Sequence, residues 1–275
     1  MHIVKIDLTT PGLSFRLSPP GGARDTVRQT TLAFADAQSA QVAVNMHFFL
    51  PYPSGDLNAD VVGFGVSRGV VFSPFELPSQ NYALVRDAPG LNIDAANNAS
   101  IVTRAPGFSD GACYLCAAND GLHVNEPVTL WNTVAGSAQI VTRGVKTIPC
   151  YVDARNPNCA LAGPGPAGYS NAHSWYDLIN ARTSIGLTQD KKTLILFTVD
   201  NAGGSSGMRV GEMADLLMAD YGVYEALNLD GGGSTTLVFE DPVTHVRAVV
   251  NKPSNGAAPR EVATSLGVFA PANTP

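Results

Sequence analysis

The stretch Tyr224-Glu-Ala-Leu-Asn-Leu-Asp-Gly-Gly-Gly-Ser-Thr-Thr-Leu-Val-Phe-Glu240 decides how the rest of this chain is interpreted. Ala226–Leu229 and Thr235–Phe239 are short apolar runs, partly β-branched, and predict two strands. Between them, Asp230 is followed by three glycines and Ser234, which predicts a tight bend. Because glycine has no Cβ, such a bend can approach a ligand closely and turn successive N–H groups toward an anion. A plain glycine-rich hairpin turn, in which Asp230 bonds its own loop, is the alternative.

Composition predicts a globular protein with a moderately acidic charge balance. The chain has 275 residues, of which 45% are hydrophobic, so one large domain or two small ones can form a core. Lys and Arg number 17 against 23 Asp and Glu, a net charge of −6, and no basic run occurs. This balance argues against nucleic acid or an anionic membrane as partner. The longest strongly apolar stretch, Leu194–Val199, is far shorter than the ~20 residues of a membrane-spanning helix, so no span is expected.

The four cysteines lie in one irregular region, at Cys113, Cys116, Cys150 and Cys159. An even number in loops predicts two disulfides in an oxidising compartment, with three possible connectivities. A zinc site built from all four thiolates is the alternative, because Cys113-x-x-Cys116 has a ligand-like spacing, although the second pair is more widely spaced than usual. We therefore expect a secreted, periplasmic or cell-surface protein, whose N-terminus here lacks a signal-peptide pattern.

Periodicity predicts an α+β fold. Apolar residues recur at helical spacing over Met208–Tyr221, and Thr193–Asp200 is a strongly β-prone run that predicts a strand buried on both faces. A short helix is expected within 28–38. We predict a mixed, mostly antiparallel β-sheet with a few packed helices in a single domain over residues 1–275. A loop-rich insertion containing the cysteines is expected at about 89–170.

Three carboxylates lie in neighbouring segments near the carboxyl end: Asp200 ends a strand, Glu212 follows on the helix, and Asp230 starts the glycine bend. Cleavage of a glycosidic bond commonly uses such paired carboxylates. Arg182 and Arg260 can each bind a phosphate through two N–H groups. These residues predict one site for sugar and phosphate, with an exposed helix charge as the alternative for Glu212. The chain has no Gly-x-Ser-x-Gly, P-loop or His-Glu-x-x-His motif, which argues against serine hydrolases, nucleotide-dependent enzymes and zinc proteases.

The segment Leu229-Asp-Gly-Gly-Gly-Ser-Thr-Thr-Leu237 resembles the signature of the phosphodiester glycosidase family. The resemblance extends, in the family's order, to Val44–Phe49, Ala181–Gly186, the strand ending at Asp200, the helix Met208–Tyr221, Asn251 and Arg260. It implies hydrolysis of a sugar joined through its anomeric carbon to a phosphodiester. The products would be the free sugar and a phosphomonoester, so the expected partner is a small-molecule or glycan phosphodiester.

Together with the resemblance, the residues predict a specific active site. Asp230 is expected to act at the anomeric centre, with either Asp200 or Glu212 as the second carboxylate. The expected substrate-binding residues are Asn45, His47, Arg182, Thr183, Gly231, Gly232, Gly233, Ser234, Asn251 and Arg260. Within this set, both arginines and the amides of the glycine bend are expected to hold the phosphate. His47 is expected as a substrate contact particular to this chain, with a core histidine bonded to a carbonyl as the alternative.

Two other interpretations remain open. A non-catalytic extracellular carbohydrate-binding protein would use aromatic side chains such as Trp175, Tyr176 and the Phe48–Phe49 pair. No motif requires a cofactor, and apart from the cysteines no ligand spacing compels a metal ion. A divalent cation held by oxygens of Asp200, Asp230 and Asn228 is a further possibility.

Overall fold

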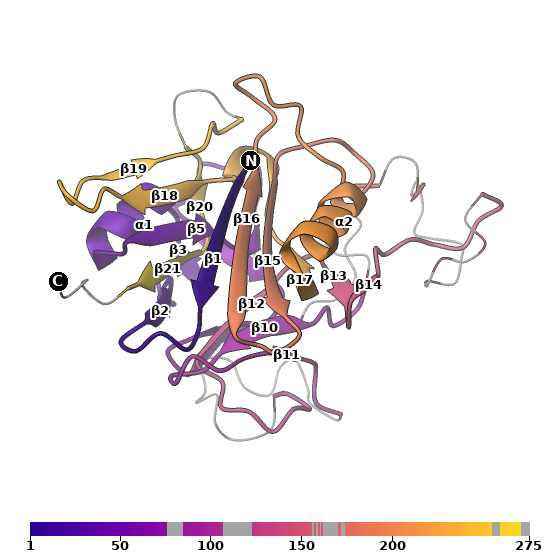
Figure 1. Ribbon diagram of the computed structural model, residues 1–275, viewed down its shortest axis with the longest axis horizontal. Coiled ribbons are helices and arrows are strands. Elements are labelled where there is room, and N and C mark those ends of the chain that lie inside the picture. Colours follow the sequence, from indigo (N-terminus) through magenta and orange to yellow (C-terminus); the bar gives the residue numbers. More distant parts are fainter. Residues whose placement is uncertain are drawn as a thin grey trace.

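The computed structural model describes residues 1–75, 85–106, 123–155, 157, 159, 161, 170–171, 174–254 and 259–270. Three antiparallel sheets and two α-helices form the body of this part of the chain (Figure 1). The predicted α+β fold, mostly antiparallel and in a single domain, is confirmed.

The first sheet is the one on which the predicted central strand lies. Its strands, in spatial order, are β1 (His2–Asp7), β16 (Thr193–Val199), β15 (Arg182–Thr188), β17 (Val223–Asn228), β13 (Ala138–Thr142) and β14 (Val145–Lys146). Helix α2 (Val210–Tyr221) packs on one face of this sheet, where Met213 and Leu217 join a buried cluster with Phe197 (Figure 1). The other face of β16 carries Leu194 and Leu196 into the main core, so the strand is buried on both faces, as predicted.

Helix α2 begins two residues later than the sequence indicated. The Glu212 carboxylate accepts a hydrogen bond from the Arg209 backbone N–H at 2.7 Å, and Arg209 is the N-cap. Gly222 ends the helix with a left-handed backbone, φ 65°. Helix α1 (Thr31–Gln38) is capped by Thr30, whose hydroxyl accepts from the Ala33 N–H at 3.1 Å. It falls inside the range predicted for a short helix.

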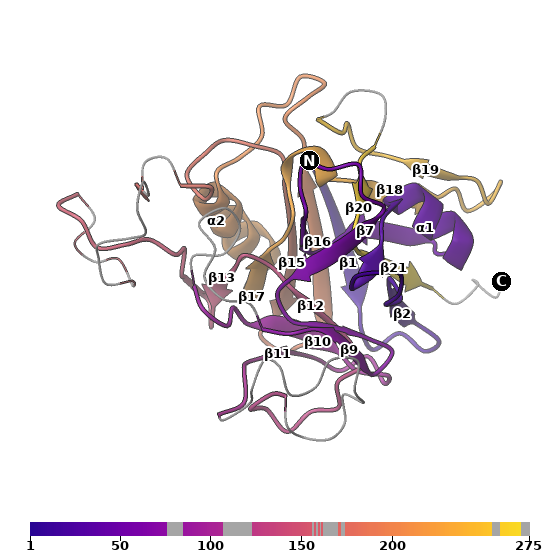
Figure 2. The same cartoon turned by 180° about the vertical axis from the view of Figure 1, so that it is seen from behind.

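Two further sheets pack against the first. The second contains β11 (Ala99–Val102), β10 (Gly90–Ile93), β12 (Asn132–Ala135), β8 (Gly65–Ser67) and β9 (Val70–Ser73). The third contains β19 (Arg247–Val249), β18 (Leu237–Glu240), β5 (Val42–Asn45), β21 (Ser265–Phe269) and β2 (Ser14–Leu17), with α1 on its outer face (Figure 2). One buried cluster contains Leu196 of the first sheet, Leu91 of the second and Val44 of the third. The main core therefore lies where the three sheets meet.

Two small sheets complete the described strands. One pairs β20 (Glu261–Val262) with β4 (Gln29–Thr30), and the other joins β3 (Thr26–Val27), β7 (Asn58–Val62) and β6 (Phe48–Leu50). Among the described residues, no helix is long and apolar enough to cross a membrane.

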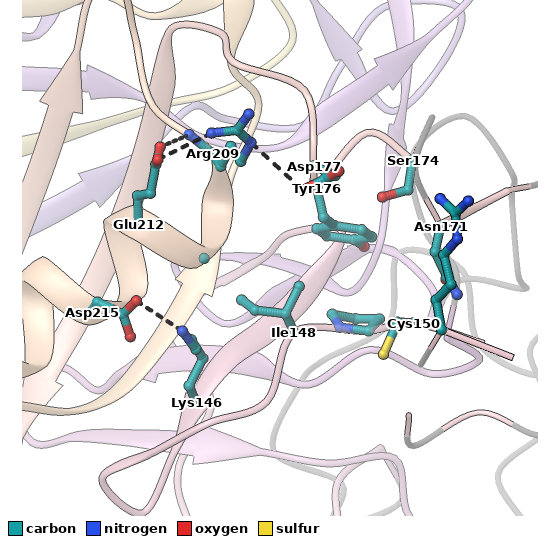
Figure 3. Close-up of a pocket in the computed structure, with 13 residues that line it drawn as sticks. Lys146, Ile148, Cys150, Asn171, Ser174, Tyr176, Asp177, Arg209, Glu212 and Asp215 are labelled. Atoms are coloured by element: carbon teal, nitrogen blue, oxygen red, sulfur yellow. Dashed lines mark hydrogen bonds and ion pairs between the residues drawn. The ribbon is translucent and has the colours of Figure 1, made fainter. Parts of the chain in front are cut away.

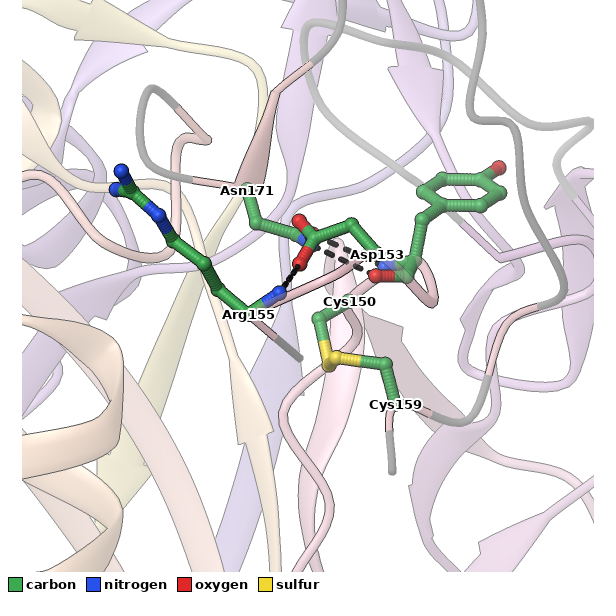
Figure 4. Close-up of a disulfide and its surroundings, with 6 residues drawn as sticks. Cys150, Asp153, Arg155, Cys159 and Asn171 are labelled. Atoms are coloured by element: carbon green, nitrogen blue, oxygen red, sulfur yellow. Dashed lines mark hydrogen bonds between the residues drawn. A yellow bond between two sulfur atoms is a disulfide. The ribbon is translucent and has the colours of Figure 1, made fainter. Parts of the chain in front are cut away.

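The cysteine-containing region contributes strands as well as loops. β10 to β14 all fall within 89–170 and belong to the first two sheets. Beyond β14, a disulfide joins Cys150 to Cys159 (Figure 4). The side chain of Asn171 holds the same loop, accepting from the Tyr151 N–H at 3.0 Å and donating to the Tyr151 carbonyl at 2.7 Å. Cys113 and Cys116 lie outside the described residues.

Gly136, between β12 and β13, lies where the backbone closely approaches β17. A Cβ added at Gly136 would lie 1.9 Å from the Asn228 carbonyl oxygen of β17. We expect Gly136→Ala to lower the free energy of unfolding by roughly 1–3 kcal/mol, because either the strand or the loop must move. Gly211→Ala is the matched control, since its Cβ would meet nothing within 4 Å. There, within α2, we expect a gain of up to ~1 kcal/mol. Denaturant unfolding measures both, and equal stability of the two variants would contradict the packing described.

Candidate active site

Asp230 follows β17 at the point where the chain passes from the first sheet to the third. Its backbone N–H donates to the Met46 carbonyl at 2.9 Å, and its own carbonyl accepts from the Asn45 side-chain amide at 2.6 Å. The residue is 7% exposed. A buried strand end thus delivers this carboxyl group, and the backbone on both sides of it is fixed by hydrogen bonds.

Asn45, at the end of β5, joins three segments. Its side-chain oxygen accepts from the Thr183 hydroxyl of β15 and from the Thr236 backbone N–H, both at 3.0 Å. With the bond to the Asp230 carbonyl, all of these interactions are with protein groups. The structure therefore places Asn45 and Thr183 behind the glycine turn, where they support it.

The glycine turn is shaped by its contact with β15. A Cβ at Gly231 would lie 2.6 Å from the Ala181 carbonyl oxygen, and the Gly232 N–H donates to that oxygen at 2.9 Å with φ 58°. Gly232–Ser234 forms a single 3-10 turn in which the Ser234 N–H donates to the Gly231 carbonyl at 3.1 Å. Three of the four amides expected to bind phosphate are thus engaged within the protein, since the Gly231 N–H bonds to the Asp230 carboxyl group. Close backbone approach explains the need for glycine at 231.

A cavity of about 490 Å³ opens over this turn. Its polar lining residues are Asp230, Arg260, Asn180, Ser254 and the glycines of the turn, and its apolar and aromatic ones are Phe49, Tyr52, Pro53 and Trp175. A concave site that combines aromatic side chains with a few polar groups is typical of small-molecule binding.

Asp230, Ser234 and Arg260 form a connected group beside this cavity. The Arg260 guanidinium donates to the Ser234 hydroxyl oxygen at 3.0 Å, and the Ser234 hydroxyl bonds in turn to the Asp230 carboxyl group. Burial raises the pKa of Asp230 to about 7, and the bond from Ser234 and the charge of Arg260 oppose that rise. A carboxyl group that titrates near neutral pH in a cavity is a candidate for proton transfer.

Arg182 does not reach the cavity. It is the first residue of β15, and its guanidinium donates to the Met208 and Trp175 carbonyls, both at 3.0 Å, and to that of Leu178. The group lies 5.4 Å from the Trp175 ring centre, and burial lowers its pKa to about 10. Because neighbouring residues of a strand point to opposite faces, Arg182 and Thr183 cannot both face one site. Arg182 instead holds the segment that carries Trp175.

Asp200 and Asn251 connect two loops beside the turn. One Asp200 carboxylate oxygen accepts from the Asn251 side-chain amide at 2.7 Å, and the other accepts from the Lys252 N–H at 3.1 Å. Asn251 also donates to the Thr235 carbonyl at 2.9 Å and accepts from the Leu237 N–H at 2.8 Å. Neither residue lines the cavity that contains Asp230. Their side chains fix the turn from its outer side.

Glu212 faces a different hollow. In the first turn of α2 its carboxylate pairs with the Arg209 guanidinium at 3.2 Å, near the Asp215–Lys146 pair at 2.8 Å (Figure 3). Its side chain is 52% exposed. This hollow also contains Tyr176 and Cys150 and does not include Asp230. The structure therefore does not bring Glu212 together with the glycine turn.

His47 lies in the core between sheets. Its Nε2 accepts from the Ala135 N–H at 3.0 Å, and its Nδ1 lies 2.8 Å from the Thr264 hydroxyl. The side chain is fully buried, and this burial lowers its pKa to about 4. The ring is therefore neutral at physiological pH, with the proton assigned to Nδ1 from these partners. It contacts no residue of the cavity through these bonds.

Four residues that line the cavity were not predicted from the sequence: Tyr52, Pro53, Asn180 and Ser254. The available signal for Tyr52 was its position between Pro51 and Pro53, a composition that presents an aromatic ring on a rigid loop. Asn180 precedes the Ala181–Gly186 segment, and Ser254 lies in the loop between Asn251 and Arg260. Neither of these two has a distinguishing pattern.

Among the described residues, no group of three or more His, Cys, Asp or Glu side chains is arranged to hold a metal ion. Both carboxylate oxygens of Asp200 already accept hydrogen bonds, and the Asp230 carboxyl group bonds to Ser234. The Asn228 side-chain oxygen, in contrast, is buried and has no hydrogen-bond partner among the described residues.

Comparison with known proteins identifies the family of this chain. The sequence profile described as "Phosphodiester glycosidase" matches residues 38–269. The chain belongs to the phosphodiester glycosidase family. Within it, the human N-acetylglucosamine-1-phosphodiester alpha-N-acetylglucosaminidase is 35% identical over 96 residues, and the Bos taurus protein of the same name is 34% identical over 96 residues. These matches cover 34% of this chain and only 18% of each relative.

Solved structures share the fold of this family member. The catalytic domain of the zebrafish N-acetylglucosamine-1-phosphodiester alpha-N-acetylglucosaminidase, auto-inhibited by its pro-peptide, superposes with a TM-score of 0.62 at 19% identity, over 98% of this chain and 83% of that one. A putative exported protein from Burkholderia pseudomallei K96243 gives 0.62 at 18% identity, over 98% and 73%. The likeness at this identity concerns the fold alone.

The raised pKa of Asp230 predicts a pH-dependent stability. The folded pKa of about 7 exceeds the unfolded value of 3.8, so the unfolded chain binds fewer protons than the folded one between these values. The wild type therefore loses stability as pH rises from about 4 to about 7. We expect Asp230→Asn, which cannot ionise, to exceed the wild type in stability at pH 8 and to lose that advantage at pH 4. Thermal melting across this range measures the difference, and a gap that does not widen with pH would contradict the assigned burial.

Proposed function

We propose that this family member hydrolyses the bond between the anomeric carbon of a sugar and a phosphodiester oxygen, releasing the free sugar and a phosphomonoester. One observation carries the proposal. A carboxyl group with a pKa of about 7, that of Asp230, is linked through the Ser234 hydroxyl to the Arg260 guanidinium at the side of an open cavity. A single site thus offers a proton acceptor and a phosphate-binding cation.

The reaction needs little help at the leaving oxygen. When the C1–O bond breaks, its electron pair stays on the phosphate, and a phosphomonoester has a second pKa of about 6. The charge that develops on the phosphate is stabilised by Arg260, which strengthens its contact as the dianion forms. Ionised Asp230 takes a proton from the water that attacks C1. The sugar hydroxyl retains the other hydrogen, and the proton later leaves Asp230 for solvent.

Among the described residues that line the cavity, Asp230 is the only one with a carboxylate. Hydrolysis of ordinary glycosides uses two carboxylates, one of which protonates the leaving group. A phosphate leaving group removes the need for that acid, so one carboxylate and one guanidinium suffice. The proposal therefore assigns no proton-transfer role to Asp200 or Glu212.

The relatives support the substrate class. The names of the human and bovine proteins specify N-acetylglucosamine joined to a phosphodiester, and we extend that chemistry to this chain as the first substrate to test. An extracellular or periplasmic location is part of the proposal. The Cys150–Cys159 disulfide and the exported bacterial protein with the same fold support it.

Removal of the Asp230 carboxylate should abolish most turnover. With the methyl phosphodiester of N-acetylglucosamine 1-phosphate as substrate, we expect Asp230→Asn to lower kcat roughly 10²–10⁴-fold, because the general base is lost. Glu212→Gln is the matched control, since Glu212 lies in the other hollow, and its kcat should stay within about twofold of the wild type. Release of free sugar measures both. Loss of turnover in Glu212→Gln with retention in Asp230→Asn would reverse the assignment.

The pH profile of the wild type provides a second test. Because kcat/KM reports the free enzyme, it should rise about tenfold per pH unit below the Asp230 pKa of about 7 and level off above it. A general base works only when ionised, which sets this sign. A profile that falls with pH between about 5 and 7 would assign Asp230 the role of an acid instead.

The aromatic residues of the cavity favour a second candidate function. Tyr52 and Trp175, which line the cavity, resemble the platforms on which carbohydrate-binding proteins stack sugars. A binding protein would hold the same phosphodiester without releasing sugar. The turnover assay with wild-type protein therefore distinguishes the two functions.

A further inference from the structure

The Arg260 guanidinium is held by two contacts of different kinds. Its Nη1 donates to the Ser234 hydroxyl at 3.0 Å, and its central carbon lies 4.3 Å from the centre of the Tyr52 ring. Across the part of the chain that is described, no carboxylate lies within ion-pair distance of it. One hydrogen bond leaves a guanidinium free to swing, so the ring contact is what sets the plane of the group.

Tyr52 is itself held firmly. Arg28, which is 8% exposed, donates to the carbonyls of Pro51 and Ser54, on either side of Tyr52. The same guanidinium lies 4.8 Å from the Phe49 ring, and Phe49 meets Tyr52 edge to face with centroids 5.9 Å apart. The buried Arg28 side chain thus fixes the loop that carries Tyr52.

Tyr52 also remains available to the cavity. Its side chain lines the site, and the residue is 41% exposed although it is large and apolar. The Tyr52 ring can therefore do two things: it orients the Arg260 guanidinium, and it contacts the ligand that this guanidinium binds in the cavity.

We propose that Tyr52 is the positioning residue that aims Arg260 at the phosphate, and thereby sets the preference of the site for an anionic sugar phosphodiester over a neutral sugar. This inference rests on the proposed function. In the wild type, the fixed guanidinium presents its remaining N–H groups in one orientation. Without the Tyr52 ring, Arg260 keeps its charge, but its guanidinium is no longer held in one orientation.

The first test compares charged and neutral ligands. For Tyr52→Leu we expect KM for the methyl phosphodiester of N-acetylglucosamine 1-phosphate to rise roughly three- to tenfold, whereas inhibition by free N-acetylglucosamine changes less than about twofold. Tyr52→Phe, which keeps the ring, should recover most of the lost affinity. Tyr221→Leu is the matched control, because Tyr221 contacts Lys5 at 5.1 Å in a similar pair and is not among the residues that line the cavity.

The second test measures the coupling of the pair. In a double-mutant cycle, Arg260→Lys should cost several-fold less in the Tyr52→Leu background than in the wild type, since the orientation is already lost. Melting temperatures of all variants are measured alongside, to compare only folded proteins.

The outcomes separate this inference from the function on which it rests. A wild-type protein that releases no sugar overturns both. Active wild type with equal losses for the diester and for free N-acetylglucosamine in Tyr52→Leu, or with independent effects in the cycle, overturns the role of Tyr52 alone. A selective loss for the diester, recovered by Tyr52→Phe, supports it.

Discussion

The site depends on the hydrogen bonds made by the side-chain amide of Asn45. This amide connects the end of β5 in the third sheet with Thr183 of β15 in the first, and it holds the turn that starts at Asp230. All of these groups are buried, so losing one partner leaves another unsatisfied at a cost of about 1–3 kcal/mol each. The turn is therefore a junction of two sheets, and its backbone has little freedom to move when a ligand binds.

This rigidity separates two classes of polar residue. Asn45, Thr183, Asp200 and Asn251 use their hydrogen-bonding atoms on other protein groups, whereas Arg260 makes only one hydrogen bond to the described residues. The first class positions the turn, and the second retains capacity for a ligand. The sequence alone does not separate the two classes, because it does not show which hydrogen-bonding atoms are already used by other protein groups.

The sequence was most informative where the signal was local. The period of 3.6 located α2 to within two residues, and the β-prone run at 193–200 located β16. Asp230, the glycines and Arg260, which the sequence assigned to one site, line one cavity. Side-chain direction was harder to obtain, since it depends on partners distant in the chain. The first-turn position of Glu212 fits a cap as well as a pocket, and Tyr52 gains its meaning from Arg260, over two hundred positions away.

The two arginines show how an acidic chain can attract an anion. The net charge is −6, yet neither Arg182 nor Arg260 has a carboxylate within ion-pair distance among the described residues. Arg182 is stabilised by backbone carbonyls behind Trp175, so its charge is solvated without being cancelled. The Arg260 guanidinium packs against the Tyr52 ring, and both residues line the cavity. Of the two, only Arg260 is among the described residues that line the cavity, and its charge acts there at short range, where it outweighs distant surface carboxylates that salt screens. Ionisation of Asp230 in the same cavity weakens this attraction for an anion.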